Sequence, residues 1–265
     1  MKFKEILNIF KNEVEPLFAE HRDYMEDHII RFCFSAYMLC KFLNKRDRIL
    51  DVGGVGIFAF LMKKLNYENI TLLGRYNSDA IEKFSKLGLS FLLCENFDED
   101  KIESKHKFDA IILFEIIEHL FDPSHLLLQL FDLCEEEGKI FCTTPNIASS
   151  YSISRLKKFE NPYCFAFYSK QQLDICHKRE FTPIEIKRIM KFSGFNFKYL
   201  TTFRSDNYLE RKDVIGMLIK CLLLFKDVKF LERKDLRGRT IFYVGIKGSQ
   251  HQQIRFPEDF YRTYV

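Results

Sequence analysis

The stretch ILDVGGVGIF, residues 49–58, joins two apolar runs through three glycines. Its first half has the composition of a buried strand, and its second half begins the helical pattern GIFAFLMKKLN. Gly53, Gly54 and Gly56 lie at the joint, where glycine lets a bound group approach the backbone. The stretch predicts the strand, loop and helix that begin a doubly wound nucleotide-binding sheet. The alternative is a tight turn that needs glycine for steric reasons only.

Strand and helix patterns alternate on both sides of this loop. An amphipathic helix over residues 27–43 leads into the first strand. The strands are apolar throughout, which is typical of a parallel sheet that helices cover on both faces. The later segments are predicted, in order, as a strand at 69–76, a helix at 78–88, strands at 89–96 and 108–114, a helix at 122–138 and a strand at 139–146.

The last third of the chain completes the predicted fold. Thr182 and Glu185 form a capping box that begins another helix, and residues 196–203 and 240–248 would form an antiparallel pair. The chain therefore predicts an α/β fold with a doubly wound, Rossmann-like, mostly parallel sheet of seven strands and helices on both faces. Its predicted divisions are an N-terminal helical extension at 1–47, an α/β domain at 48–248 with insertions near 147–181 and 205–240, and a C-terminal tail at 249–265.

Charge and cysteine content limit the partners and the compartment. The chain has 41 Lys and Arg against 37 Asp and Glu, and a net charge of +4 suits an anionic substrate without demanding nucleic acid. Eight cysteines without a C-x-x-C pair indicate reduced thiols in a cytoplasmic protein. The apolar run at 214–225 is too short for a membrane span, so we expect it in the core or in a homodimer interface.

Four segments occur in a characteristic order: ILDVGGVG, FDAIILFEIIEHLFDPSHLLLQL, GKIFCTTPN and REFTPIEIKRIMKFSGF. Together they resemble class I S-adenosylmethionine-dependent methyltransferases, particularly small-molecule O-methyltransferases with an E-x-x-E-H motif. The resemblance extends over residues 48–195. It implies that the α/β domain is a methyltransferase domain and that the protein is an enzyme that uses S-adenosylmethionine.

The resemblance also implies which residues hold the cofactor. Asp51 would orient the glycine loop and the methionine amino group, while the backbone of the three glycines would pass beside the cofactor. Glu95 or Asn96, at the end of the third strand, would face the adenine, although Glu95 could also be a solvated acid. Phe114, which ends the fourth strand, would lie beside the cofactor as well.

Two features depart from the family pattern. The loop DVGGVG is one residue shorter than usual, and the second strand ends in LLGRYNSD, where the family has an acid for the ribose hydroxyls. Arg75 cannot accept a hydrogen bond, so Tyr76, Asn77 or Asp79 would have to replace that acid. An arginine here also suits the 2′-phosphate of NADP, which makes an NADP-binding reductase an alternative.

The stretch FEIIEHL, residues 114–120, contains the candidate catalytic residues. If it is helical, Glu115, Glu118 and His119 share one face and could bind Mg²⁺ or Mn²⁺. The pattern resembles the metal site of methyltransferases that modify the terminal 2′-hydroxyl of small RNAs or methylate catechol-type quinone precursors, and this resemblance adds His177 as a fourth ligand. In the alternative without metal, Glu118, His119 and His177 hold the substrate or move its proton.

The segment at 148–179 mixes aromatic and basic residues, which suit a sugar ring, a nucleotide or an RNA end. The sequence thus predicts O-methylation of a small hydroxylated metabolite that contains a sugar or phosphate, such as a nucleotide-linked precursor of a surface polysaccharide. The alternatives are an RNA 3′-terminal 2′-O-methyltransferase and a catalytically silent methyltransferase-like binding protein.

Overall fold

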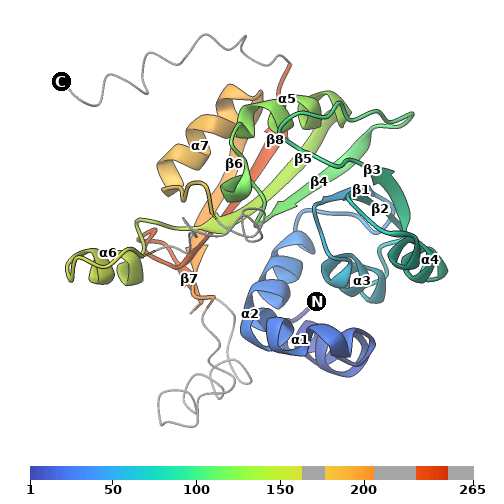
Figure 1. The fold of residues 1–265 in the computed structure, drawn as a ribbon, viewed down its shortest axis with the longest axis horizontal. Coiled ribbons are helices and arrows are strands. Elements are labelled where there is room, and N and C mark those ends of the chain that lie inside the picture. Colours follow the sequence, from blue (N-terminus) through green and yellow to red (C-terminus); the bar gives the residue numbers. More distant parts are fainter. Residues whose placement is uncertain (163–176, 206–230, 250–265) are drawn as a thin grey trace.

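The computed structural model describes residues 1–162, 177–205 and 231–249, and Figure 1 shows a central sheet between two layers of helices. Within the described residues the sheet has eight strands, in the order β3-β2-β1-β4-β5-β8-β6-β7. The strands are β1 (Arg48–Val52), β2 (Asn69–Gly74), β3 (Ser90–Leu93), β4 (Phe108–Phe114), β5 (Cys134–Pro145), β6 (Phe195–Phe203), β7 (Glu232–Arg233) and β8 (Thr240–Lys247).

The strand order confirms the doubly wound fold. Strands β1 to β5 pair in parallel, whereas β8 lies antiparallel between β5 and β6. Strands β2 and β3 lie on one side of β1, and β4 and β5 lie on the other. The chain therefore reverses its direction across the sheet between β1 and β4. In open α/β sheets, ligands bind outside the carboxyl ends of the strands at such a point.

The predicted number of seven strands is wrong by one. The additional strand, β7, has two residues, and it pairs antiparallel with the end of β6 through Thr202–Arg233 and Phe203–Glu232. Two residues are too few to show the alternation of apolar and polar side chains that marks a strand in a sequence. This strand also lies inside the second predicted insertion, where charge alone favours a solvated segment.

The helices are α1 (Phe3–Ile9), the π-helix η1 (Phe10–Val14), the 3₁₀-helix η2 (Glu15–His21), α2 (Arg22–Leu39), α3 (Ile57–Lys64), α4 (Ser78–Lys86), the 3₁₀-helix η3 (Ile117–His119), α5 (Pro123–Leu133), α6 (Ser150–Leu156) and α7 (Pro183–Phe192). In Figure 1, α1, α2 and α3 cover one face of the sheet, and α5 and α7 cover the other.

Each face of the sheet has its own core, because successive strand residues point to opposite sides. Ile49 lies in the core beneath α1, α2 and α3, whereas Leu50 lies in the core beneath α5 and α7. The N-terminal helices contribute fully buried side chains such as Phe10, and Phe34 of α2 stacks on Phe203 with 4.2 Å between ring centroids. The N-terminal extension is therefore part of the core, and this packing fixes α2 relative to the sheet.

One predicted helix is shorter than expected. The pattern at 122–138 predicts a helix up to Gly138, but α5 ends at Leu133 and β5 begins at Cys134. Three consecutive glutamates follow at 135–137, and negative charge is unfavourable at the carboxyl end of a helix. Phe108 instead pairs with Cys134, and the register shifts before Ala110 pairs with Lys139.

Every helix within residues 1–162, 177–205 and 231–249 falls short of the length or apolar character that crossing a bilayer requires. The apolar run at 214–225, on which the expected dimer interface depends, lies outside the described residues, as do the centre of the first insertion and the tail from residue 250.

Candidate active site

A cleft of about 1790 Å³ opens at the carboxyl ends of β1, β2 and β4, where the strand order reverses. Pockets for a single small ligand occupy about 300–1,000 Å³, so this cleft has room for a nucleotide-sized cofactor and a second molecule. Its walls come from α2, the glycine loop, the segments that follow β2, β3 and β4, α6, residues 177–180 and the segment that enters β8.

The glycine loop forms part of the cleft wall. Gly53 and Gly56 have φ angles of 69° and 85°, a backbone region that favours glycine. A Cβ atom on Gly53 would lie 2.3 Å from the Cδ1 atom of Ile116, so a larger residue would also have to displace that side chain. The Tyr76 hydroxyl donates a hydrogen bond of 2.6 Å to the carbonyl oxygen of Gly54. The Tyr76 hydroxyl therefore holds the loop beside the cleft.

Asp51 lies near the carboxyl end of β1 and is 3% exposed. Its Oδ2 atom has no hydrogen-bond partner among the described residues, and burial raises the pKa of the carboxyl group to about 7. A buried carboxylate without a partner is costly, so this atom marks a place for a cation or a hydrogen-bond donor. The methionine amino group predicted beside Asp51 has this chemistry.

The predicted replacements for the ribose acid are used by the fold itself. Tyr76 lines the cleft, but its hydroxyl holds the glycine loop. The Oδ1 atom of Asn77 accepts a hydrogen bond of 2.8 Å from the backbone N–H of Ala80 and so caps α4. Arg75 is exposed and lines the cleft, whereas Asn77 and Asp79 are absent from the described part of its lining.

Glu95 and Asn96, which are predicted to face the adenine, both line the cleft beyond β3. Their backbone N–H groups donate to the same Oδ2 atom of Asp100, over 2.9 and 2.8 Å. The Oδ1 atom of Asn96 accepts from the N–H of Asp98. Asp100, which the sequence did not single out, thus fixes this edge of the cleft.

Glu115 does not join the other predicted metal ligands. Its φ angle is 56°, a left-handed conformation that is uncommon outside glycine, and it comes just before η3. Its Oε2 atom accepts a hydrogen bond of 2.8 Å from Nη1 of Arg31 on α2. The expectation that Glu115, Glu118 and His119 share a helical face therefore fails, because Glu115 is turned toward α2. Phe114 packs against the Phe58 ring in the core beneath α2.

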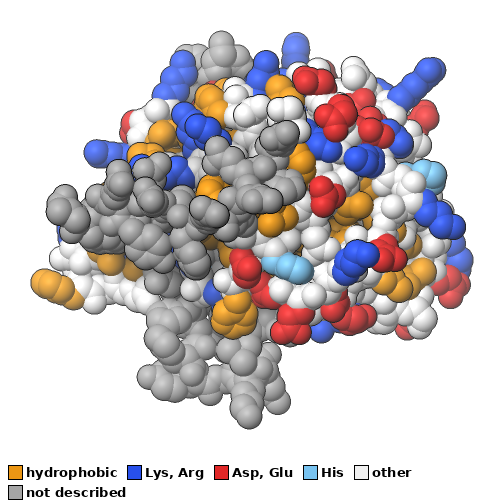
Figure 2. Space-filling view, turned by 90° about the horizontal axis from the view of Figure 1, so that it is seen from above, with side chains coloured by type: hydrophobic (Ala, Val, Ile, Leu, Met, Phe, Trp, Pro, Cys, Tyr) orange, Lys and Arg blue, Asp and Glu red, His pale blue; other side chains and the backbone are white. Residues whose placement is uncertain are grey.

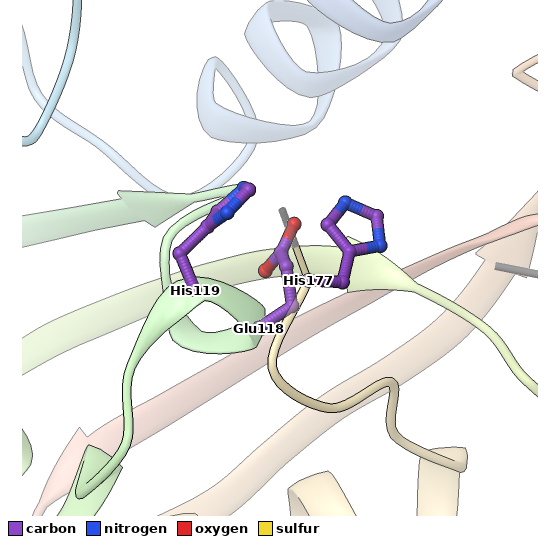
Figure 3. Close-up of side chains that lie close together, drawn as sticks. All are labelled: Glu118, His119 and His177. Atoms are coloured by element: carbon purple, nitrogen blue, oxygen red, sulfur yellow. The ribbon is translucent and has the colours of Figure 1, made fainter. Parts of the chain in front are cut away.

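Glu118, His119 and His177 do come together (Figure 3). Their potential ligand atoms lie within 4.8 Å of one another, and the rings of His119 and His177 are 5.0 Å apart. The backbone N–H of Lys178 donates a hydrogen bond of 2.8 Å to the carbonyl oxygen of Glu118. This bond holds the segment before α7 against η3.

The Glu118 carboxyl group is fully buried. Its Oε2 atom accepts a hydrogen bond of 2.8 Å from the Thr144 hydroxyl, while its Oε1 atom has no partner among the described residues. Burial, together with the nearby charge of Glu115, raises the pKa of Glu118 well above its usual range. Glu118 therefore keeps its proton more readily than an exposed glutamic acid does, and a cation that binds at Oε1 would favour its loss.

His177 is oriented by a second acid. Its Nδ1 atom lies 2.9 Å from the Oε1 atom of Glu180. A carboxylate can only accept a hydrogen bond, so Nδ1 is the donor, and in the neutral ring Nε2 then has a lone pair for a ligand or a substrate proton. Carboxylates hold metal-binding and catalytic histidines in this way.

The N-terminal extension supplies cleft residues that sequence reasoning missed. Tyr24, His28 and Arg31 line the cleft from α2, and Nη2 of Arg31 donates a hydrogen bond of 2.9 Å to the Tyr24 hydroxyl. Burial and the Arg31 charge lower the pKa of His28 to about 3, which keeps its ring neutral. The spacing i, i+4, i+7 places these polar residues on one helical face. This polar face on a helix was the sequence pattern that could have indicated these cleft residues.

The strand order, the glycine loop and the cleft at the strand reversal are those of a doubly wound α/β protein. A family model described as Methyltransferase domain matches residues 18–200, and the chain belongs to this family. The protein is thus a class I S-adenosylmethionine-dependent methyltransferase, and the predicted enzyme class is confirmed. No curated protein matches the sequence.

Solved structures share the fold at low identity. A methyltransferase from Thermotoga maritima is 17% identical with a TM-score of 0.56, and the match covers 91% of this chain and 99% of that chain. The 1,6-didemethyltoxoflavin-N1-methyltransferase of Burkholderia thailandensis, solved with S-adenosylhomocysteine, is 12% identical with a TM-score of 0.55, covering 94% and 92%. A methyltransferase from Archaeoglobus fulgidus is 18% identical with a TM-score of 0.52, covering 87% and 99%.

Proposed function

We propose that the protein transfers a methyl group from S-adenosylmethionine to a hydroxyl oxygen of a small metabolite. The observation that carries this proposal is the cluster of Glu118, His119 and His177 on the wall of a cleft that has room for two molecules. A hydroxyl group is a weak nucleophile at neutral pH. Its methylation therefore requires a group that accepts the hydroxyl proton or weakens the O–H bond. The two imidazoles supply such a group.

The chain's residues would act in a simple sequence. The glycine loop and Asp51 hold the cofactor, while the second molecule lies against the cluster. The Nε2 atom of His177, oriented by Glu180, accepts the proton of the attacking hydroxyl. The methyl group then passes to the hydroxyl oxygen by in-line displacement: the bond between the methyl carbon and the sulfonium sulfur breaks as the new bond to oxygen forms, and S-adenosylhomocysteine leaves. This step depends mostly on the positions of the two molecules.

The same cluster fits a divalent metal ion. One carboxylate and two imidazoles are a common ligand set, the Oε1 atom of Glu118 is buried without a described partner, and Glu180 orients His177. A bound ion would supply a Lewis acid that favours loss of the proton from the acceptor hydroxyl. In this proposal the ligands would be Glu118, His119 and His177, so His177 acts as the base only when no ion is bound, and Glu115 belongs to another part of the site.

A basic and aromatic wall supports an acceptor that carries a sugar or a phosphate. The guanidinium carbon of Arg239 lies 4.2 Å from the centroid of the Tyr151 ring, and Nη1 of Arg155 donates a hydrogen bond of 3.0 Å to the Tyr151 hydroxyl. All three residues line the cleft. Arginines recognise phosphate oxygens, and aromatic rings pack on sugars. A nucleotide-linked sugar combines both groups.

The RNA 3′-terminal alternative shares the histidine cluster, but the surface charge favours a small acceptor. Figure 2 shows acidic and basic side chains interspersed over the described part of one face, in keeping with the net charge of +4. Proteins that follow a nucleic-acid backbone usually gather basic residues on one surface. The family match also favours methyl transfer over the NADP-binding reductase that Arg75 suggested.

Calorimetric titration with S-adenosylmethionine, after EDTA treatment and again with added Mn²⁺, tests whether the protein binds the cofactor and whether it binds a metal ion. We expect binding in both conditions, and we expect Mn²⁺ itself to bind wild-type protein but not Glu118→Ala. The matched control is His106→Ala, because His106 is exposed and is not among the residues that line the cleft. Unchanged metal content in Glu118→Ala would remove the metal from the proposal.

A further inference from the structure

The end of α6 carries a group of exposed apolar side chains. Ile153, Leu156 and Phe159 are 37%, 51% and 100% exposed, and we call these three residues the apolar tip. Ile153 and Leu156 are three positions apart and so lie on one side of the helix, while Phe159 follows just beyond its end. In Figure 1, α6 stands out from the sheet near β7. Single exposed apolar residues are ordinary on a protein surface, whereas a group of them marks an interaction site.

The helix ends in a cap that normally contains glycine. The N–H of Phe159 donates a hydrogen bond of 2.9 Å to the carbonyl oxygen of Leu156, and the N–H of Glu160 donates one of 3.1 Å to that of Arg155. These two bonds are those of a Schellman motif, in which the residue at the position of Phe159 is left-handed. The φ angle of Phe159 is 58°.

Phenylalanine is an unfavourable choice at this position. Glycine usually occupies it, because a side chain is strained in the left-handed conformation. The fold gains no buried contact in return, since the Phe159 side chain is fully exposed. Unfavourable backbone conformations of this kind are concentrated at functional sites. The cost therefore indicates that the Phe159 ring acts on something outside the folded chain.

Two positive charges lie within the apolar tip. Lys157 and Lys158 are exposed and stand between Leu156 and Phe159 in the sequence. Neither lysine forms an ion pair with a described residue. Segments that bind the surface of a membrane combine these features: their apolar side chains enter the headgroup region, and their basic side chains attract anionic lipids.

We propose that the apolar tip docks on an anionic membrane surface, with Leu156 and Phe159 inserted below the headgroups and Lys157 and Lys158 beside them. A protein partner fits the tip less well, because lysine is depleted at the centre of protein interfaces. A second copy of this chain fits less well still, since a symmetric contact would bring four lysines together.

The docked tip would lie beside the cleft. The residues of α6 and of the segment after it that line the cleft flank the tip on both sides in the sequence: Tyr151, Arg155, Asn161 and Pro162. The N–H of Ser150 donates a hydrogen bond of 3.1 Å to the carbonyl oxygen of Arg237, which fixes the start of α6. A protein that docks through this tip therefore holds the mouth of its cleft next to the lipid surface.

Co-sedimentation of the full chain with lipid vesicles tests the proposal. Wild-type protein should bind vesicles of mixed phosphatidylcholine and phosphatidylglycerol at least about tenfold more tightly than vesicles of phosphatidylcholine alone. Phe159→Gly should weaken binding to the mixed vesicles by at least about tenfold. The Tm of this variant should equal or exceed that of wild type, because glycine suits the cap. A role of Phe159 in the fold alone predicts a lower Tm instead.

A second variant removes the two charges and keeps the apolar side chains. Lys157→Gln with Lys158→Gln should bind the mixed vesicles about 5- to 30-fold more weakly than wild type. Its control is Lys105→Gln with Lys107→Gln, which changes the charge equally in the exposed segment before β4, at the other end of the strands from the cleft.

Leu93→Ala is the control for Phe159→Gly. Leu93 is 61% exposed and lies on β3, at the opposite edge of the sheet from β7. Both control variants should bind the mixed vesicles as wild type does.

The proposal is overturned if wild-type protein does not bind the mixed vesicles, or binds both kinds of vesicle equally. Unchanged binding in Phe159→Gly would place the contact elsewhere on the chain and would overturn it too. Sedimentation velocity without lipid separates the remaining case: a wild-type dimer that becomes a monomer in Phe159→Gly would show that the tip joins two copies of the chain. None of these measurements depends on S-adenosylmethionine, so their failure leaves the proposed methyl transfer untouched.

Discussion

Replacing Arg31 with methionine should destabilise the protein strongly, because it removes one partner of a buried ion pair. Nη1 of Arg31 lies 2.8 Å from Oε2 of Glu115, and the two side chains are 13% and 16% exposed. Removing one partner of such a pair costs about 3–5 kcal/mol, since the other charge stays buried. At roughly 2–4 °C of Tm per kcal/mol in a chain of this size, Tm should fall by about 6–20 °C. Thermal and urea unfolding measure the change.

The double variant Arg31→Met with Glu115→Gln gives the sharper result. Because it leaves no uncompensated charge, it should be more stable than the sum of the two single changes predicts, by more than about 1 kcal/mol. Lys86→Met is the control, since its partner Glu82 lies 2.6 Å away in a pair that is exposed on both sides, and such pairs contribute little. The reasoning is refuted if the changes in the free energy of unfolding of the two single variants simply add in the double variant. It is also refuted if Arg31→Met and Lys86→Met lose the same amount of stability.

Three further predictions concern the cofactor. Gly54→Ala would place a Cβ atom 2.7 Å from Oδ2 of Asp51, so calorimetry should show S-adenosylhomocysteine binding at least about tenfold weaker; unchanged affinity would contradict the placement of Asp51. Arg75→Glu restores the acid expected at the end of β2, and the same assay should show about 10- to 100-fold tighter binding; weaker binding would show that Arg75 itself holds the ribose. Burial raises the folded-state pKa of Asp51 from 3.8 to about 7. Between these two pH values the folded protein keeps a proton that the unfolded chain releases. The Asp51 carboxyl group therefore lowers the free energy of unfolding as the pH rises through this range. Asp51→Asn should therefore be stabilised relative to wild type more at pH 8 than at pH 5, as urea unfolding of the ligand-free protein can show; an equal effect at both values would place the Asp51 pKa outside the window.

The fold could be predicted because its main determinants are local. Apolar runs of strand length, helical repeats between them and the glycines at 53, 54 and 56 lie within a few residues of one another. The two-residue β7 could not be predicted, since its partner Thr202 lies 31 residues before Arg233. A strand of that length exists only through its pairing.

The candidate site could be predicted in part. The resemblance predicts that Glu118, His119 and His177 lie together, and the structure places their ligand atoms within 4.8 Å of one another. The position of Glu115 could not be predicted, because it depends on Arg31, which lies 84 residues away. A charge pair between distant segments leaves no pattern in either segment. The cleft residues on α2 did leave a pattern, a polar face with i, i+4, i+7 spacing, but nothing in that pattern marked them as part of the cleft.

The measurement that tests the central claim most directly is transfer of a labelled methyl group from S-adenosylmethionine to a panel of nucleotide-linked sugars, catechols and short RNAs. Wild-type protein should label a hydroxyl group of a nucleotide-linked sugar, and His177→Gln should lose this activity while it still binds S-adenosylhomocysteine. Labelling of a nitrogen atom, or full activity in His177→Gln, would contradict a hydroxyl methyltransferase built on Glu118, His119 and His177.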